Sequence, residues 1–538
     1  MFTIVACGLW SLGAYIYSRE GAGQGITRLE SGSPKMNYRV HENRALVFLR
    51  DNYLLILIFL LGLGLRIYDL GAESIWYDEA VSIAVSKLSI FEQLKWNLTE
   101  SDNNPPLYYA ILHFWVSVFG DSEFSSRLPS AIFGSLTIFA IYGLGNLLFD
   151  RKTGLIAALI LATSVFHVWF SQEARAYTLL TLLTLVSFYY FVKLLSAPQD
   201  KFYMAAYLVS GVLLLYTHYY GLPVIAAQNI YCFTQYLRRR KPGRLEMIKW
   251  VKLQLVLLLF FLPVSVLLIK HGSAVREGFW ITPPAFSEVL GYFLTYSGSA
   301  PILYLLVIFS LFSVVSLGDI KNVRNYRGFL KPFDDSSGAS GIPYRSRVYL
   351  LIVWMLSLIL IPFLISRIMT PVLIYRYTIG ASPVLYLLAS KGVSGTNNNK
   401  LMIIFAGLIM VFSFVNIEKN YSRIDKFQWR EAVADIETNA GYGDILAVYP
   451  RFELEPVRYY SRRGDILKGP LVKDFFSPSE ARDKNIWVMV STHWGIDKEV
   501  LKEELRKKYD FVAEKKYANL DVYKLKIKRE GKTTALTP

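Results

Sequence analysis

The fold is decided by residues 53–80, where the apolar run YLLILIFLLGLGLRIY (53–68) is soon followed by IWYDEA (75–80). The apolar run is close to the length that a helix needs to cross a bilayer. An adjacent aspartate and glutamate, Asp78 and Glu79, then stand where the chain leaves the lipid. Carboxylates are costly near hydrocarbon and are often kept there for function. Two interpretations stay open at this point: a chemical role, or capping of a helix that begins near Ala80.

The composition is typical of a membrane protein. Of the 538 residues, 53% are hydrophobic and 19% charged, with a mean hydropathy of +0.33, whereas soluble domains carry more charge. Cys7 and Cys232 both lie inside apolar runs, which excludes a disulfide framework and a cysteine metal site. The net charge of +16 resides mostly in short loops between apolar runs. The positive-inside rule explains that placement, so no nucleic-acid partner is expected.

Repeated apolar runs predict an all-α polytopic membrane protein with about eleven transmembrane helices. A twelfth is left open, because residues 2–17 are apolar but short and could be an extra span, a poor signal segment or a leader. Basic clusters such as RRRK (238–241) fall on one side, which is predicted to be cytoplasmic. The predicted spans are 53–68, 130–149, 154–170, 178–195, 202–216, 222–237, 251–269, 301–317, 348–365, 377–389 and 402–414.

The first exterior loop, residues 69–125, is predicted to carry interfacial helices. Apolar residues recur at helical spacing from 81 to 96, which indicates one amphipathic helix along the membrane surface. Pro105 and Pro106 are expected to open a second helix at 107–119, since proline suits the first turn. The loop is therefore expected to be structured.

A change of character near residue 420 predicts a separate C-terminal domain. Helical patterns at 429–438 and 497–507 alternate with strand patterns at 445–449, 486–490 and 522–527, which indicates a small α/β domain. An odd number of spans places it outside, as a lid or recognition domain. The predicted organisation is an N-terminal segment (1–51), a transmembrane domain (52–419) and an extracytoplasmic domain (420–538).

Polar elements from distant parts of the chain meet the same predicted membrane face. They are Asp78-Glu79, NNPPLYY (103–109), QEARAY (172–177) and His218. A carboxylate can accept a proton from an acceptor hydroxyl or amine, and an arginine can bind a leaving phosphate through two hydrogen bonds. A lipid-linked phosphosugar supplies both the phosphate and an anchor at the interface.

The sequence resembles the GT-C membrane glycosyltransferases. The likeness is closest to the family-39-like branch of protein O-mannosyltransferases, aminoarabinose transferases of lipid A and RgtA/B-like enzymes. It is detailed over 53–221 and rests on WYDE (76–79), NPPLY (104–108), FG with RLPS (119–120 and 127–130) and SQEARAY (171–177). The resemblance implies a multi-pass cell-membrane enzyme that transfers a sugar, with inversion, on the non-cytoplasmic face. Its donor is a polyprenyl-phosphate-linked sugar, and its acceptor is a lipid, glycan or protein.

The resemblance also implies roles for individual residues. Asp78 is the expected general base, and Glu79 assists it or binds a metal. Arg175 is expected to hold the lipid phosphate, and Arg376 and Tyr377 form an element that approaches it. The residues expected to shape the sugar or phosphate pocket are Gln172, Glu173, Tyr177, Asn104 and His218.

Asn104 departs from the family pattern, in which many relatives have histidine. Asparagine lacks the imidazole that binds zinc or another divalent ion well. We therefore assign no metal ligands and no certain cofactor, and we predict transfer that is metal-independent or only weakly assisted by a divalent ion.

Alternatives remain for some residues and for the function. Arg175 could be a snorkelling interfacial residue, His113 and His167 are better explained by packing, and His218 is open between packing and binding. The main alternative function is a transporter or flippase for a lipid-linked or anionic substrate; a scaffold subunit is a third. A transporter typically has repeated halves and charges near mid-membrane, and this chain has neither pattern.

Overall fold

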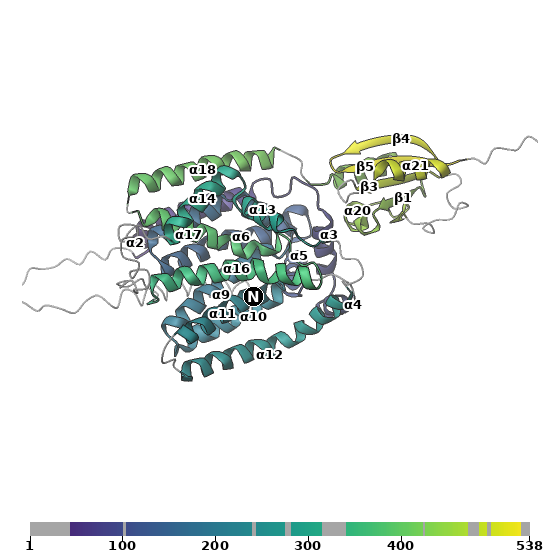
Figure 1. Cartoon of the computed structure of the whole chain (residues 1–538). Coiled ribbons are helices and arrows are strands. Elements are labelled where there is room, and N and C mark those ends of the chain that lie inside the picture. The colour runs from purple at the N-terminus through teal and green to yellow at the C-terminus, as the bar shows by residue number, and fades with distance from the viewer. Residues whose placement is uncertain are drawn as a thin grey trace, which may run out of the picture. The chain divides into compact units, whose positions relative to one another are not determined.

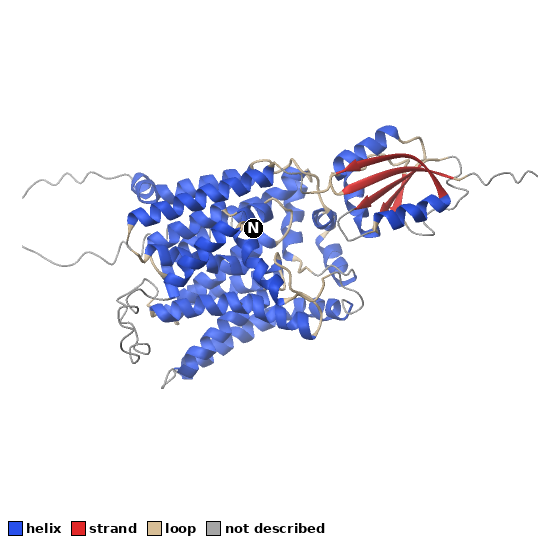
Figure 2. Ribbon diagram, turned by 45° about the horizontal axis from the view of Figure 1, so that its top comes forward, coloured by secondary structure: helices blue, strands red, loops and turns tan. Residues whose placement is uncertain are grey.

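The computed structural model describes residues 44–99, 104–238, 244–274, 281–314, 341–396, 398–422, 426–471, 484–491 and 497–528. The chain divides into two units, Met1–Tyr53 and Leu54–Pro538, and the second holds almost all described residues. Helices dominate this unit, and strands occur in the C-terminal part (Figures 1 and 2). The predicted N-terminal run at 2–17 lies outside the described residues.

In its described residues, each predicted span coincides with a helix or with a pair of helices. Among the described residues, five helices are long and apolar enough to cross a membrane, or seven if each bent pair forms one span. The helical membrane architecture is thus supported, while the number of about eleven crossings stays a prediction. The elements are α2 (Arg44–Ile67), α6 (Glu123–Leu148), α7 (Arg151–Thr163), α8 (Val165–Ser171), α9 (Tyr177–Ser196), α10 (Lys201–Thr217), α11 (Gly221–Arg238), α12 (Arg244–Ala274), α14 (Ala300–Val314), α16 (Tyr344–Ile368), η3 (Tyr377–Ala381), α17 (Ser382–Ser394) and α18 (Asn399–Tyr421).

Two bends interrupt these helices. The predicted span 154–170 is two helices, α7 and α8, which meet at 60°. The break at Ser164 exposes carbonyls at the end of α7, and Arg66 donates to two of them, those of Leu161 (3.2 Å) and Ala162 (3.0 Å). The second bend, of 98°, joins α14 to α13 (Phe286–Ser297), a helix that the sequence analysis did not predict.

The first exterior loop is more broken than predicted. In place of one amphipathic helix over 81–96, the structure has α3 (Tyr77–Ser86) and α4 (Ile90–Thr99), so that prediction was wrong. Ser89 and Glu92 form a capping box: Ser89 Oγ accepts from the Glu92 amide (3.3 Å), and Glu92 Oε2 accepts from the Ser89 amide (2.9 Å). The second helix, α5 (Leu107–Phe119), is confirmed with the predicted bounds.

The C-terminal part contains a five-stranded sheet in the order β2-β1-β3-β5-β4. β2 and β3 run parallel to β1, whereas β5 pairs antiparallel with β3 and β4. The predicted helices and strands are present, and β2, β4 and α20 were missed. The elements are α19 (Trp429–Asn439), β1 (Ile445–Tyr449), η4 (Arg451–Glu453), α20 (Leu454–Tyr460), β2 (Leu467–Pro470), β3 (Ile486–Ser491), α21 (Lys498–Lys508), β4 (Tyr509–Tyr517) and β5 (Leu520–Ile527).

Helices cover both faces of this sheet (Figure 2). Residues of α19 and α20, such as Trp429 and Val457, pack with Leu446 and Met489 on one face. Leu505 of α21 packs with alternate strand residues on the other face. Because successive strand residues point to opposite faces, each strand contributes to both cores. The C-terminal part therefore has the predicted small α/β fold, in three layers, while its status as a separate domain from residue 420 stays a prediction.

Candidate active site

The two adjacent carboxylates at the start of α3 have different partners. Trp76 precedes the helix in an extended conformation, and its amide donates to Glu79 Oε2 at 3.4 Å. Glu79 thus caps the helix, as one of the two initial interpretations proposed. Asp78, in the same turn, contacts arginines instead.

Glu79 is fully buried in a network of donors. Arg127 donates to both of its oxygens, from Nε at 2.7 Å and from Nη2 at 2.8 Å. The Ala174 amide (2.9 Å) and Lys426 Nζ (3.4 Å) complete the network. Burial by itself raises the pKa of Glu79, but the charges of Arg127 and Lys426 outweigh it and lower the pKa to about 2. Glu79 is therefore ionised and bound on all sides, as a structural residue would be.

Arg127 holds the segment that leads into α3. Its remaining N–H groups donate to the backbone carbonyls of Leu70 (3.0 Å), Glu73 (2.9 Å) and Ser74 (2.9 Å). Together with the two bonds to Glu79, all five guanidinium N–H groups are used. In the sequence, Arg127 stands out only as part of the RLPS motif (127–130), which does not indicate this role.

Asp78 is the partly accessible member of the pair, with 16% of its side chain exposed. Its Oδ2 lies 3.9 Å from Arg175 Nε and 3.6 Å from Arg376 Nη2. Arg175 also donates to the Asp78 carbonyl (3.2 Å) and to Ser82 Oγ (3.1 Å). One carboxylate thus faces two guanidinium groups that come from distant parts of the chain.

Aromatic rings flank the second of these arginines. The guanidinium carbon of Arg376 lies 5.6 Å from the ring centroids of both Trp76 and Tyr377, within the range of cation–π attraction. The predicted Arg376-Tyr377 element therefore does reach Asp78 in the structure.

Several buried polar atoms near this cluster have no hydrogen-bond partner among the described residues: Glu173 Oε2, the Tyr177 hydroxyl and Trp76 Nε1. Glu173 Oε1 accepts from Trp169 Nε1 at 2.9 Å. Burial raises the pKa of Glu173 to about 7, although Lys426 opposes the shift. Buried polar groups are normally satisfied, so this group of open atoms suits a polar ligand.

Gln172 and His218 contact other groups. Gln172 Nε2 donates to the Tyr68 carbonyl (2.7 Å) and the Tyr421 hydroxyl (3.3 Å), so its side chain joins the ends of α2 and α18. His218 Nδ1 accepts from the Tyr220 amide (3.1 Å), and its ring lies 4.9 Å from that of Tyr377. His218 thus packs beside the cluster.

The other candidates are placed as follows. Asn104 is half-buried just before α5, and its role in the pocket stays a prediction. His113 Nδ1 lies 2.8 Å from the Ser86 carbonyl, and His167 Nε2 lies 2.8 Å from Ser382 Oγ, both structural contacts. In the described part of the chain, no group of three or more His, Cys, Asp or Glu side chains is arranged to hold a metal ion.

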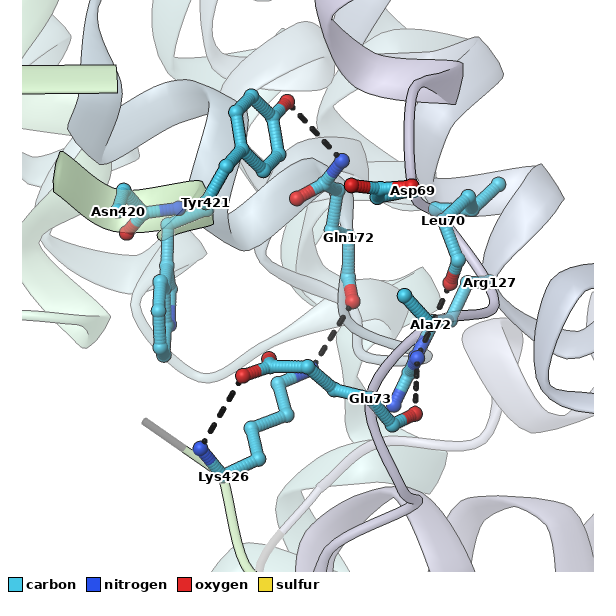
Figure 3. A pocket seen from close by; sticks show the side chains of 10 residues that line it. Asp69, Leu70, Ala72, Glu73, Arg127, Gln172, Asn420, Tyr421 and Lys426 are labelled. Atoms are coloured by element: carbon cyan, nitrogen blue, oxygen red, sulfur yellow. Dashed lines mark hydrogen bonds between the residues drawn. The ribbon is translucent and has the colours of Figure 1, made fainter. Parts of the chain in front are cut away.

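A small pocket of about 50 Å³ lies beside Gln172 (Figure 3). Figure 3 shows Gln172 linked to Tyr421 on one side and to Lys426 on the other. The volume suits one or two water molecules and is too small for a sugar ring. Its lining residues are Asp69, Leu70, Ala72, Glu73, Arg127, Trp169, Gln172, Asn420, Tyr421 and Lys426.

One protein family and several solved structures are similar to this chain. The sequence model of the family described as dolichyl-phosphate-mannose-protein mannosyltransferase matches residues 103–267. No curated protein matches the chain in sequence.

Solved structures share its fold. ArnT from Cupriavidus metallidurans superposes with TM-scores of 0.55 bound to undecaprenyl phosphate and 0.56 in the apo state, at 12% and 11% identity; each covers 88% of this chain and 98% of its own. The Archaeoglobus fulgidus oligosaccharyltransferase in complex with zinc and sulfate has a TM-score of 0.50 at 13% identity, covering 87% and 73%. The family match and the shared fold confirm the resemblance of this chain to the GT-C membrane glycosyltransferases.

Proposed function

We propose that the chain is an integral membrane glycosyltransferase that takes a sugar from a polyprenyl-phosphate-linked donor and passes it to an acceptor on the non-cytoplasmic face. The observation that carries the proposal is the cluster of Asp78 with Arg175 and Arg376. Two cations beside one accessible carboxylate suit a phosphate leaving group and a base in one place. The undecaprenyl phosphate bound to ArnT supports the same class of lipid.

The reaction is a direct displacement with inversion. The acceptor hydroxyl or amine attacks the anomeric carbon, a new bond forms there, and the bond from that carbon to the phosphate oxygen breaks. The electron pair stays on the phosphate, whose charge Arg175 and Arg376 bind. Asp78 takes the proton of the acceptor. The open polar atoms of Glu173, Tyr177 and Trp76 provide hydrogen-bonding groups for the sugar.

Mass spectrometry of lipids from cells with and without the chain tests the proposal. A polyprenyl-phosphosugar should accumulate when the chain is absent, which identifies the donor. Purified protein should then release polyprenyl phosphate from that lipid when acceptor is added. A transporter would move the lipid between leaflets without releasing its sugar, and that result would replace the proposal with the alternative function.

Topology is tested separately. A reporter fused after residue 240 should read cytoplasmic, and one fused after Tyr421 should read exterior. If both reporters read the same compartment, the predicted number of crossings is wrong, and the predicted site elements no longer share one face.

A further inference from the structure

One lysine joins the C-terminal part to the cluster described above. Lys426 follows α18 and precedes α19, and only 7% of its side chain is exposed. Its Nζ donates to Glu79 Oε2 at 3.4 Å and to the Gln172 carbonyl at 3.2 Å. The ammonium also lies 5.8 Å from the ring centroid of Trp169.

These contacts connect the two segments that carry the proposed chemistry. Glu79 is the neighbour of Asp78, and Gln172 stands three residues before Arg175. The bond from the Ala174 amide to Glu79 joins the same two segments at 2.9 Å. Lys426 therefore adds a third chain segment, from beyond the last membrane helix, to this junction.

The following residues continue the attachment. Arg430 Nη2 donates to the Ala72 carbonyl at 2.7 Å, and Ser74 Oγ donates to Glu431 at 3.1 Å. The Ile75 amide donates to the Tyr460 hydroxyl at 2.7 Å. The C-terminal part thus holds in place the loop segment that leads directly to Asp78.

Arg127 already binds both oxygens of Glu79, so Lys426 is a second cation on this carboxylate. The carboxyls of Glu173 and Glu73 also lie near its ammonium group. Burial of a charge costs free energy, and here burial, followed by the nearby Arg127, lowers the pKa of Lys426. Because burying Lys426 costs free energy and the residue lies at this junction, we look for its role in how the segments are positioned.

We propose that Lys426 is a positioning residue that sets the distance between the Asp78 and Arg175 segments and thereby couples the C-terminal domain to transfer. The inference rests on the proposed function for its kinetic part only. A displacement of about 1 Å between reacting groups can cost about 10²-fold in rate. Lys426 acts through Glu79 and the Gln172 carbonyl and touches no substrate.

The test compares Lys426→Met with Lys426→Arg and with Lys419→Met, which removes an exposed lysine from the end of α18. For Lys426→Met, kcat should fall by about 10²-fold with a smaller change in KM for the donor. Lys426→Arg should restore part of kcat, and Lys419→Met should match the wild type. Among these proteins, only Lys426→Met should show faster hydrogen exchange than the wild type in a peptide covering residues 71–80.

An unchanged kcat in Lys426→Met, or equal losses in both methionine variants, overturns the proposal. If Lys426→Met does not fold, Lys426→Gln, which keeps a donor without the charge, takes its place. Hydrogen exchange decides the structural coupling without any substrate. Wild-type protein that transfers no sugar therefore refutes the proposed function, whereas unchanged exchange at 71–80 refutes the coupling by Lys426.

Discussion

Two regions on either side of one peptide bond differ in almost every physical respect. Around Glu79 the structure is closed: the carboxylate is inaccessible, and Arg127, Ala174 and Lys426 donate to it. Around Asp78 the carboxylate is partly accessible, its arginine partners are more distant, and buried polar atoms nearby lack partners among the described residues. Glu79 thus supports the local structure, while Asp78 carries the chemistry in the proposed function, and variants of the surrounding residues test this difference.

The largest effect is expected for Asp78→Asn, which keeps the shape and removes the basicity. Transfer should fall by about 10²–10⁴-fold, while donor binding stays nearly intact. Turnover and donor binding measured side by side in purified protein check this. Normal turnover in Asp78→Asn with none in a folded Glu79→Gln protein would move the base to Glu79.

Glu79→Gln should act on stability instead. It removes the charge that two hydrogen bonds from Arg127 surround, and breaking a buried pair costs about 3–5 kcal/mol of unfolding free energy. Thermal unfolding in detergent should show a clearly lower Tm for Glu79→Gln. The exposed control variant Glu418→Gln should have the Tm of the wild type. A stable Glu79→Gln protein would contradict the closed, structural nature of this region.

Glu173→Gln should change how stability depends on pH. Because the pKa of Glu173 is raised from 4.5 to about 7, the folded state binds more protons than the unfolded state between these values. The free energy of unfolding therefore falls as pH rises through this window. At pH 8 the variant should be more stable than the wild type by up to about 3 kcal/mol, and the two should converge near pH 4. If the Tm values of the variant and the wild type change with pH in parallel, the carboxyl of Glu173 does not have a raised pKa in the folded protein.

The smallest effect is expected for Arg175→Ala. Donor affinity should fall by about 10- to 100-fold, since a hydrogen bond to a charged group contributes about 1.5–3 kcal/mol. Direct binding of the polyprenyl-phosphosugar measures this loss. A Tm measurement shows whether the variant stays folded without the bonds from Arg175 to the Asp78 carbonyl and Ser82. If Arg175 only snorkels at the interface, donor affinity should not change.

Much of the fold follows from local patterns in the sequence. Long apolar runs predicted the membrane helices, and Pro106 before a regular pattern predicted α5. The break between α3 and α4 carried a readable signal, the Ser89 and Glu92 capping box, which a long amphipathic pattern obscured. β4 was missed because it is an exposed edge strand with charged residues, which reads as a loop.

The candidate site was less predictable, because its support is not local. Motifs pointed to Asp78, Arg175 and Arg376, and the structure brings these three together. Nothing in the sequence around Arg127 or Lys426 indicates that their side chains converge on Glu79. Those contacts join positions 48 and 347 residues apart, and such pairings arise only when the helices pack.

The five bonds of Arg127 also bear on conformational entropy. Fixing one residue of backbone costs about 1–2 kcal/mol, and this one guanidinium holds the chain at four points between Leu70 and Glu79. The segment that presents Asp78 is therefore ordered during folding, before any ligand arrives. A ligand that meets a segment already ordered keeps more of its interaction energy for affinity and orientation. Lysine, with one nitrogen and no planar fork, could not replace Arg127 here, since it cannot reach so many acceptors at once.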